Sequence, residues 1–506
     1  MSAPPQAARV ASVEGSVASV WRRRLLPVLA VVVPFVVYLR TMAPTVYGLD
    51  SAELTTGSYV LGIVHSPGSP LFLLLGHVFT WLPFGDVGYR VNLLSAVAAA
   101  VGVGFVYLVL LRLTRDALLS LAGSWCLAFT YYFWVSALAA ELYALHACFV
   151  AGLILLALRW YERPGPLELC GFTFGFGLAT GNHLSMSVLA PGYAYLLTAA
   201  PVDRWRRPRV LLPAIGCGLL GACVYLYLPL RGMAGTPLDY ARNWGVDVTT
   251  WQGFWWMVSG EMFGPRFFAV PATQLPTEVG LYAYRLWSNF VGLGCLFGIV
   301  GLYDDLPRHR AIHVALLLMF AGHLAFMLTY NVGDKELMLV PTYLIWDVWV
   351  ALGVQATVRY VAQRTSGRVA LSAGALLLVM SAGNLVVNFG RVDISDDLSA
   401  RQRGETLFSG LPPHSVFIGT WADVPILEYL QLVEHERPDV ETMNLFFVHG
   451  SERAQFLASR LATGRPLYTS VPKLFGGVPA TFEHEAACDC YRIEVRPSPG
   501  LAPGSS

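Results

Sequence analysis

The stretch at residues 43–70 reads APTVYGLDSAELTTGSYVLGIVHSPGSP, and it decides the fold and the function that we expect. It follows the first apolar run of the chain and carries Asp50 and Glu53, three residues apart, and then His65. An ionisable group at mid-depth in a bilayer costs ~2.5–3.5 kcal/mol on the insertion scale and is usually retained for function. Two acids directly after a membrane segment therefore predict a functional site at the membrane surface.

The composition is that of an integral membrane protein. Of the 506 residues, 55% are hydrophobic and only 13% are charged, whereas about 25% of the residues of a soluble protein are charged. The net charge of +1 argues against a nucleic-acid-binding protein, because such a protein needs a strongly basic surface. We therefore expect the lipid bilayer, and no nucleic acid, among the partners.

Eleven apolar runs are long enough to cross about 30 Å of hydrocarbon, which predicts a polytopic α-helical membrane protein with about 11 transmembrane helices. The run at 25–39 follows three arginines like the core of a signal peptide, but it lacks a convincing cleavage site and should remain as a span. Residues 71–82 are too short to span and are expected to be re-entrant or interfacial. The other runs are 92–111, 117–136, 141–158, 168–182, 184–199, 210–229, 287–303, 311–329, 341–358 and 369–388.

Basic residues predict the orientation of these spans. With the N-terminus in the cytoplasm, arginine clusters at 22–24, 204–209 and 359–368 all fall on the cytoplasmic side, as the positive-inside rule requires. The polar groups that are unusual for membrane depth then fall on the opposite face, so we expect one extracytoplasmic cavity there. These groups are 50–53, 141–146, 182–183, 231, 240–244 and 330–336.

The chain divides into four predicted segments. Residues 1–24 are expected to be a disordered cytoplasmic N-terminus, and residues 25–389 to be the transmembrane domain. Residues 390–496 contain frequent charges and short mixed patterns, which predict a small extracytoplasmic α/β domain. Residues 497–506 are rich in proline, glycine and serine and are expected to be a disordered tail.

Local patterns refine the two large segments. In the C-terminal domain, strand-like runs at 415–419 and 443–448 flank a helix-like run at 422–436. In the transmembrane domain, the aromatic loop at 230–286 is expected either to lie in the membrane interface or to cover an acyl-chain groove.

The eight cysteines show no zinc-binding spacing. Cys488 and Cys490 are separated by one residue, and we expect them to be too close for an easy mutual disulfide. The other six lie in or beside apolar runs and are interpreted as small core residues; they are Cys126, Cys148, Cys170, Cys217, Cys223 and Cys295.

Several motifs resemble those of one known family. GLDSAEL at 48–54 and LGIVHSPGSPL at 61–71 are similar to its signature GDSGEL … LGIAHPPGYPL. Further similar motifs are AELYAL at 140–145, GNHL at 181–184, YLPLR at 227–231, NWG at 243–245, YNVGDKE at 330–336 with Pro341 and Tyr343, and RPDV at 437–440. The family is that of the transmembrane protein O-mannosyltransferases that act on plexin-type receptors, together with bacterial relatives.

This resemblance covers residues 45 to 440 and implies the GT-C fold of glycosyltransferases that use polyprenyl-phosphate sugars. The chain departs from the signature at Leu49, Ala52, Ser66 and Ser69, which leave both acids in place. The resemblance implies transfer of a sugar, mannose in the first instance, from a polyprenyl-phosphate-linked donor to a hydroxyl group. Serine or threonine of a protein is the expected acceptor; a glycan or lipid acceptor is the nearest alternative.

An inverting transfer needs a base for the acceptor hydroxyl and positive charge or hydrogen-bond donors for the leaving phosphate. The resemblance gives the role of base to Asp50. Glu53 lies one helical turn further on and would orient the acceptor or share the proton. The alternative is structural, because S/D-x-x-E is also the pattern of a capping box at a helix start.

Binding of the donor phosphate or sugar is assigned to Arg231, His183, Asn182, Lys335 and His65. Arginine binds phosphate oxygens through two parallel hydrogen bonds, so Arg231 is the first candidate, although an arginine at a helix end can also snorkel to the interface. Lys335 would either neutralise phosphate or pair with neighbouring acids, and His65 and His183 have structural alternatives as well. Supporting roles are assigned to Glu141, Asp334, Glu336 and Trp244.

No cofactor is certain. Asp334 and Glu336 beside Asp50 are compatible with a divalent cation, and the metal is left unassigned.

The competing hypotheses are a transporter or lipid flippase and a non-catalytic scaffold for the C-terminal domain. Scarce lysine against abundant arginine favours the inner membrane of a bacterium over the endoplasmic reticulum.

Overall fold

A computed structural model describes residues 24–200, 208–333, 335–364, 372–448, 452–476 and 480–495. The predictions of disorder for residues 1–23 and 497–506, and the role of Asp334, lie outside the described residues. The boundaries of the predicted segments remain predictions.

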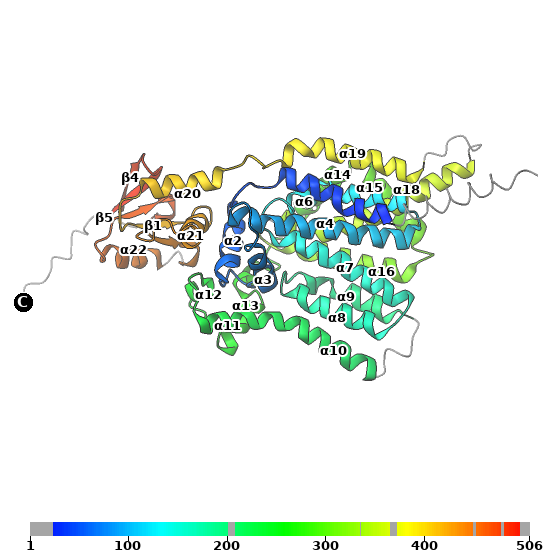
Figure 1. The fold of residues 1–506 in the computed structure, drawn as a ribbon, viewed down its shortest axis with the longest axis horizontal. Coiled ribbons are helices and arrows are strands. Elements are labelled where there is room, and N and C mark those ends of the chain that lie inside the picture. The colour runs from blue at the N-terminus through cyan, green and yellow to red at the C-terminus, as the bar shows by residue number, and fades with distance from the viewer. Residues whose placement is uncertain are drawn as a thin grey trace, which may run out of the picture.

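The larger part of the molecule is a bundle of helices, with α4, α7, α8, α9 and α10 side by side (Figure 1). Its first helix is Arg24–Thr41. The rest are α2 (Asp50–Val60), α3 (Pro70–Phe79), α4 (Val87–Thr114), α5 (Ala117–Ala128), α6 (Tyr131–Val135), α7 (Leu142–Glu162), α8 (Pro166–Thr180), α9 (Met186–Thr198), α10 (Pro208–Ala222), η1 (Cys223–Leu226), α11 (Tyr227–Ala234), α12 (Tyr240–Asn243), α13 (Trp251–Val258), η2 (Glu261–Arg266), α14 (Leu275–Asn289), α15 (Leu293–Asp305), α16 (Arg310–Thr329), α17 (Lys335–Met338), α18 (Val340–Arg364) and α19 (Ala373–Val392).

The helical membrane fold is confirmed, whereas the number of spans remains a prediction. Among the described residues, six helices are long and apolar enough to cross a membrane. A seventh span results if α14 and α15, which meet at a bend of 97°, are counted together. The remaining predicted spans correspond to shorter or less apolar helices such as α5. The short segment predicted at 71–82 is the ten-residue helix α3.

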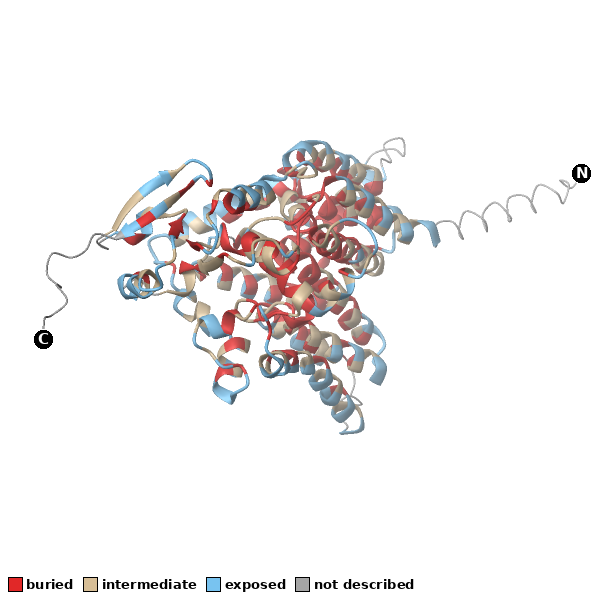
Figure 2. Cartoon of the chain, turned by 60° about the vertical axis from the view of Figure 1, so that its left-hand side comes forward, coloured by how far each residue is buried: buried red, intermediate tan, exposed pale blue. Residues whose placement is uncertain are grey.

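Small residues bring helices of the bundle into close contact. A Cβ atom added to Gly301 of α15 would lie 1.9 Å from the carbonyl oxygen of Trp349 in α18, and one added to Gly353 would lie 1.8 Å from that of Phe297. Without a side chain at these positions the two backbones touch, which is how membrane helices gain van der Waals contact. The most buried residues accordingly lie in the middle of the bundle (Figure 2).

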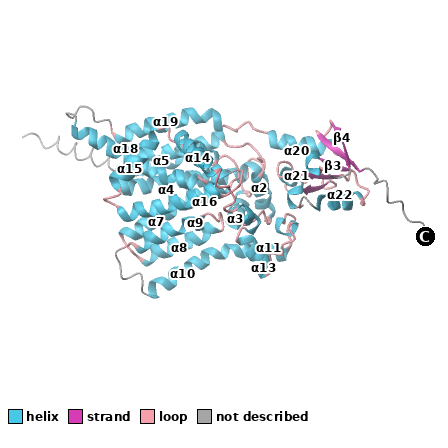
Figure 3. Ribbon diagram, turned by 180° about the vertical axis from the view of Figure 1, so that it is seen from behind, coloured by secondary structure: helices cyan, strands magenta, loops and turns pink. Residues whose placement is uncertain are grey.

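The named strands all belong to the C-terminal domain, at one end of the molecule (Figure 3). The sheet has the order β2-β1-β3-β5-β4, with β2, β1 and β3 parallel and β5 and β4 antiparallel to their neighbours. The predicted strand at 415–419 is β1, the predicted helix at 422–436 is α21, and the run at 443–448 divides between β2 and η3. The elements are α20 (Ser399–Gly410), β1 (Val416–Gly419), α21 (Val424–Leu432), β2 (Glu441–Asn444), η3 (Leu445–Phe447), α22 (Arg453–Leu461), β3 (Leu467–Thr469), η5 (Pro472–Phe475), β4 (Ala480–Glu485) and β5 (Cys490–Val495).

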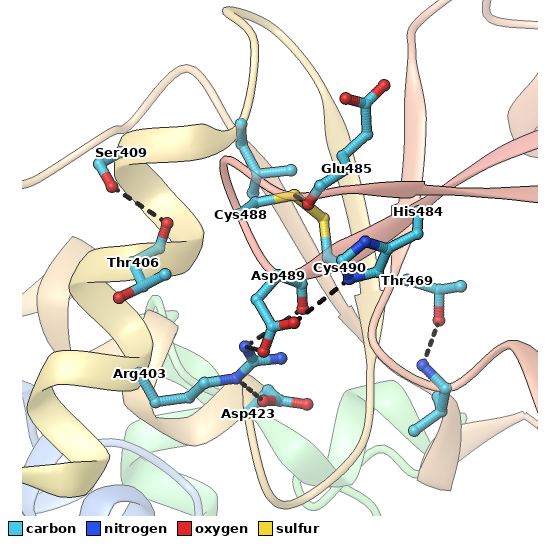
Figure 4. Close-up of a disulfide and its surroundings, with 12 residues drawn as sticks. Arg403, Thr406, Ser409, Asp423, Thr469, His484, Glu485, Cys488, Asp489 and Cys490 are labelled. Carbon is cyan, nitrogen blue, oxygen red and sulfur yellow. Dashed lines mark hydrogen bonds and ion pairs between the residues drawn. A yellow bond between two sulfur atoms is a disulfide. The ribbon is translucent and has the colours of Figure 1, made fainter.

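The prediction for the last two cysteines was wrong. Cys488 and Cys490 form a disulfide in the turn between β4 and β5 (Figure 4). Their Cα atoms are 5.2 Å apart, within the usual range for a disulfide. The intervening Asp489 has φ 47°, so the tight turn brings the two side chains to the same side. Arg403 of α20 binds the Asp489 carboxylate at 3.0 Å and ties this turn to the domain.

The C-terminal domain packs directly on α2. Ile426, Tyr429 and Leu430 of α21 belong to one apolar cluster with Ala52 of α2 and with Val46. This contact places the C-terminal domain against the helix that begins with Asp50.

Candidate functional site

The carboxylates of Asp50 and Glu53 do not cap α2. The N-cap residue is Leu49, with φ 57° and ψ −133°, and no side chain accepts a hydrogen bond at this helix end. The capping-box interpretation is therefore wrong for this helix. Both acids lie in its first turn, where the helix dipole favours negative charge, and both point to partners from other parts of the chain.

Glu53 is fully buried and held by His65. Its Oε1 accepts a hydrogen bond from the backbone N–H of His65 at 2.5 Å, and its Oε2 lies 2.6 Å from His65 Nδ1. Burial raises the pKa of the Glu53 carboxyl, and the charge and hydrogen bonds of His65 oppose this rise. The His65 ring packs edge-on against Phe263 and Trp421, with ring centroids 6.0 and 5.7 Å away.

Asp50 binds a side chain of the C-terminal domain. The indole Nε1 of Trp421 donates to Asp50 Oδ1 at 2.6 Å. Asp50 itself is half-buried, and one hydrogen bond to Oδ1 leaves Oδ2 as an oxygen able to accept a proton. The site is thus built by both parts of the chain.

One carboxylate of the C-terminal domain, that of Glu428, lies near Glu53. Tyr240 of α12 is buried and donates its hydroxyl hydrogen to Glu428 of α21. Its backbone N–H donates to Ile63 at 2.8 Å, which fixes α12 beside the loop that carries His65. The pKa of Glu428 is raised to about 8, chiefly by burial; the Tyr240 hydrogen bond opposes the rise, and the nearby charge of Glu53 adds to it.

Asp50, Glu53 and His65 are arranged as a possible cation site. One ligand atom from each lies within 4.8 Å of the others. Two carboxylate oxygens and one imidazole nitrogen suit a divalent cation such as Zn²⁺ or Mn²⁺. The sequence analysis grouped Asp50 with Asp334 and Glu336 for such an ion, whereas Glu336 forms an ion pair with Arg285.

Arg231 lies at the opposite end of α2 from Asp50. Its Nε donates to Leu61 O at 2.7 Å and its Nη2 to Val60 O at 3.3 Å. An arginine at the last carbonyls of a helix satisfies orphan acceptors and complements the dipole. With a rise of about 1.5 Å per residue, the ten steps from Asp50 to Val60 separate the two groups by about 15 Å.

Lys335 also has internal partners. Its ammonium group is buried, lies 2.8 Å from Glu278 Oε2 and donates to Tyr330 O at 3.4 Å. Pairing with an acid was the structural alternative for this residue, although the acid comes from α14 and not from its neighbours.

Asn182 and His183 form a second polar cluster, in the turn between α8 and α9. Asn182 is buried and donates from Nδ2 to Leu142 O at 3.1 Å. His183 Nδ1 lies 2.7 Å from Ser185 Oγ, which is itself 3.1 Å from His146 Nε2. Glu141 occupies the N-cap position of α7, and its backbone N–H donates to Ser95 at 3.2 Å.

Trp244 supports the contact between the two parts of the chain. Its ring packs edge-on against Phe446 and Phe447 of the C-terminal domain, with centroids 5.7 and 5.9 Å away.

The structure adds three residues that sequence reasoning missed: Trp421, Glu428 and Arg266. No local pattern marks the first two, since each lies in a segment that reads as an ordinary strand–helix unit. Arg266 of η2 is exposed and lies 5.6 Å from the Phe263 ring, which contacts His65. Within the described part of the chain, Arg266 forms no ion pair. It is an exposed cation that Phe263 separates from His65.

One family and two curated proteins are similar to this chain or to parts of it. Residues 50–206 match the family described as the N-terminal domain of the protein O-mannosyl-transferase TMEM260. The chain is 22% identical over 467 residues to the protein O-mannosyl-transferase tmem260 of Dictyostelium discoideum, covering 81% of this chain and 56% of that protein. It is 31% identical over 228 residues to the protein O-mannosyl-transferase TMEM260 of Mus musculus, covering 43% of this chain and 31% of that protein. The chain thus spans about half or less of the length of these relatives.

Two solved structures share the fold. They are ArnT from Cupriavidus metallidurans bound to undecaprenyl phosphate and the same protein in the apo state. The TM-scores are 0.58 and 0.59, both at 12% sequence identity, and the alignments cover 93% and 92% of this chain and 97% of each ArnT chain. The likeness confirms the GT-C fold.

Proposed function

We propose that this chain, whose residues 50–206 match the N-terminal domain of the TMEM260 protein O-mannosyl-transferases, is an inverting glycosyltransferase that uses a polyprenyl-phosphate-linked sugar. The acceptor is a hydroxyl group, in the first instance that of serine or threonine in a protein, and the sugar to test first is mannose. The observation that carries the proposal is the cluster of Asp50, Glu53 and His65, closed by Trp421.

In this mechanism Asp50 is the general base. Its Oδ2 takes the proton of the acceptor hydroxyl while the hydroxyl oxygen bonds to the anomeric carbon of the sugar. The bond between that carbon and the phosphate oxygen breaks, and the polyprenyl phosphate leaves with the electron pair. Trp421 fixes the Asp50 carboxylate through Oδ1, which prepares the geometry before the substrate arrives.

Glu53 and His65 would position the reacting groups. The buried Glu53 carboxylate holds the His65 backbone and ring, which fixes the imidazole beside Asp50. Arg266 would supply the positive charge that the leaving group requires. Asn182 and His183 remain candidates for sugar contact. Arg231 and Lys335 remain candidates for phosphate contact only if they exchange their present partners.

The same three groups, Asp50, Glu53 and His65, would hold a divalent cation. Such an ion would supply Lewis-acid stabilisation of phosphate charge when bound. Treating the purified enzyme with a chelator and then restoring Mg²⁺, Mn²⁺ or Zn²⁺ tests for it, with transfer activity and metal content as readouts.

The cluster faces the extracytoplasmic side in our proposal, with the N-terminus in the cytoplasm. The disulfide between Cys488 and Cys490 supports this orientation, because disulfides persist in oxidising compartments. The inner membrane of a bacterium is the proposed location on composition. The endoplasmic reticulum is the alternative, since both named relatives are eukaryotic.

The decisive experiment uses purified protein and a panel of polyprenyl-phosphate-linked hexoses with a threonine-containing peptide. Mass spectrometry should detect a peptide that is heavier by one hexose. The Asp50→Asn variant should insert and fold but lose transfer by at least 1,000-fold. Wild-type transfer in that variant would remove Asp50 from the role of base, and movement of intact donor across vesicles without transfer would favour a flippase.

A further inference from the structure

A cavity of about 560 Å³ lies where the two parts of the chain meet. The helical part lines it with Asn243 of α12. The C-terminal domain lines it with Glu428 of α21, residues 442–444 of β2 and one side of α22. This volume is within the range of sites that hold a ligand, about 300–1,000 Å³.

The strand that borders this cavity is an edge strand. β2 is the first strand in the described sheet order and pairs there only with β1. Glu441 donates its backbone N–H to Ser415 O at 3.0 Å, so its backbone faces the inner neighbour. Along a strand, successive residues alternate in direction. The backbone N–H and C=O of Thr442 and the N–H of Asn444 therefore face the open side, where they can pair with another strand, while the Asn444 C=O starts the 3₁₀ turn η3.

A buried polar atom at the same place has no partner. Asn444 is 6% exposed, and its Oδ1 accepts from Phe446 N–H at 3.0 Å. Its Nδ2 has no hydrogen-bond partner among the described residues, although it lines the cavity. An unpaired buried donor costs about 1–3 kcal/mol, so the donor favours a ligand with an acceptor such as a carbonyl oxygen.

The cavity adjoins the carboxylate cluster. Glu428 lines the cavity and also accepts the hydroxyl hydrogen of Tyr240. Phe447 lines it as well and packs against the Tyr240 ring at 4.8 Å and the Trp421 ring at 6.0 Å. A ligand in the cavity would thus be one layer of side chains from the residues that hold Asp50 and Glu53.

We propose that the open edge of β2 binds an extended segment of the acceptor polypeptide as an additional strand, with its serine or threonine delivered toward Asp50. This inference rests on the proposed transfer to a hydroxyl group and names the form of the acceptor. Main-chain hydrogen bonds to a sheet edge give affinity without demanding one sequence. At about 3.3 Å per residue, the four residues of β2 offer about 13 Å of edge. An acyl chain could not satisfy these backbone groups, and so a polypeptide is favoured.

Binding is tested first on the full wild-type chain in detergent. The probe is a fluorescent nine-residue threonine peptide, compared with two versions that carry N-methyl groups on alternate residues, one set in each version. In an added strand, only alternate residues direct their backbone N–H groups to β2. The version that is N-methylated at those residues should bind at least tenfold more weakly than the version that is methylated at the others. Equal dissociation constants for all three peptides, or saturable binding of a glycan acceptor but of no peptide, would overturn the inference.

Two variants test the same edge through transfer kinetics. Proline is tolerated on edge strands when its missing N–H faces outward, so Thr442→Pro should fold while losing one outward donor. We expect the wild type to have a KM at least tenfold lower for the nine-residue peptide than for a single blocked threonine, and Thr442→Pro to reduce this ratio at least fivefold. Asn444→Leu removes the unpaired Nδ2 and should reduce the ratio as well. Glu483→Ala, on the exposed face of the opposite edge strand β4, is the control and should keep the ratio.

These experiments separate the docking inference from the proposed function. Transfer with no dependence on peptide length or N-methylation would refute docking on β2 and leave the glycosyltransferase proposal intact. Peptide binding that depends on which residues are N-methylated, with no transfer from any donor, would support docking on β2 and contradict the glycosyltransferase proposal. If Thr442→Pro fails to fold, the N-methylated peptides on the wild-type chain still decide the question.

Discussion

Trp421 Nε1 and Asp50 Oδ1, 371 residues apart in the chain, are joined by a hydrogen bond of 2.6 Å. The bond links a side chain of the C-terminal domain to the proposed catalytic base at the start of α2. The C-terminal domain is therefore part of the candidate site.

Replacing Trp421 should impair catalysis. Trp421→Phe keeps an aromatic ring beside His65 but removes the donor to Asp50. A hydrogen bond to a charged group contributes about 1.5–3 kcal/mol, so kcat should fall about 10- to 100-fold with little change in the KM for the donor. Steady-state transfer kinetics measure this, and a kcat equal to that of the wild type would show that Trp421 only packs.

Replacing Glu53 should disturb His65. Glu53→Gln keeps the size of the side chain but loses the charge that faces the imidazole, and we expect kcat/KM to fall at least tenfold. The double variant Glu53→Gln, His65→Gln should lose clearly less than the product of the single losses, because the two residues act as one unit. Strictly multiplicative losses would mean that they act independently.

Arg266 should contribute mainly to binding of the donor, and Arg231 mainly to thermal stability. Arg266→Gln removes the exposed cation near the cluster and should raise the KM for the polyprenyl-phosphate donor about tenfold, with little effect on thermal stability. Arg231→Gln removes the partner of the last α2 carbonyls and should lower the melting temperature, with a smaller effect on donor KM. The reverse pattern would restore Arg231 as the principal phosphate ligand.

The free energy of unfolding should decrease as the pH rises, because Glu428 titrates differently in the folded and unfolded chain. Burial raises its pKa from the ordinary value of 4.5 to about 8, so between these values the folded chain holds a proton that the unfolded chain has released. Stability is then greatest below pH about 4.5 on account of this group and decreases as the pH rises to about 8. Melting curves of the purified protein from pH 5 to 8.5, followed by tryptophan fluorescence, should show this decrease.

Glu428→Gln is the matched variant for that measurement. Glutamine keeps an oxygen that accepts from the Tyr240 hydroxyl but cannot titrate, so the variant should show a flatter dependence over the same range. Identical slopes for wild type and variant would assign the decrease to other groups.

Much of the architecture is readable in the sequence because hydrophobic runs and short motifs are local signals. Apolar length predicts membrane helices, and the acids at 50 and 53 stand out against them. The number of spans is harder to obtain, since α5 and α18 fall below the limits of length or hydropathy and α14 and α15 meet at a sharp bend. No periodicity encodes that bend.

The candidate site could be predicted only in part. Asp50, Glu53 and His65 are close in sequence, so the motif that contains them also places them together in space. Trp421 and Glu428 reach the site through packing of α21 on α2, which depends on tertiary contacts that no local pattern reports. Arg231 stood out because a guanidinium binds phosphate oxygens through two parallel hydrogen bonds, yet its guanidinium donates instead to the carbonyls of Val60 and Leu61. The pairing of Cys488 and Cys490 depends on the left-handed backbone of Asp489.

The position of Trp421 has a consequence for how such enzymes diversify. A chimaera that exchanges the C-terminal domain between two relatives would also exchange a ligand of the proposed base. New acceptor preferences acquired by domain shuffling would then require that an indole, or a substitute for it, arrive with the incoming segment.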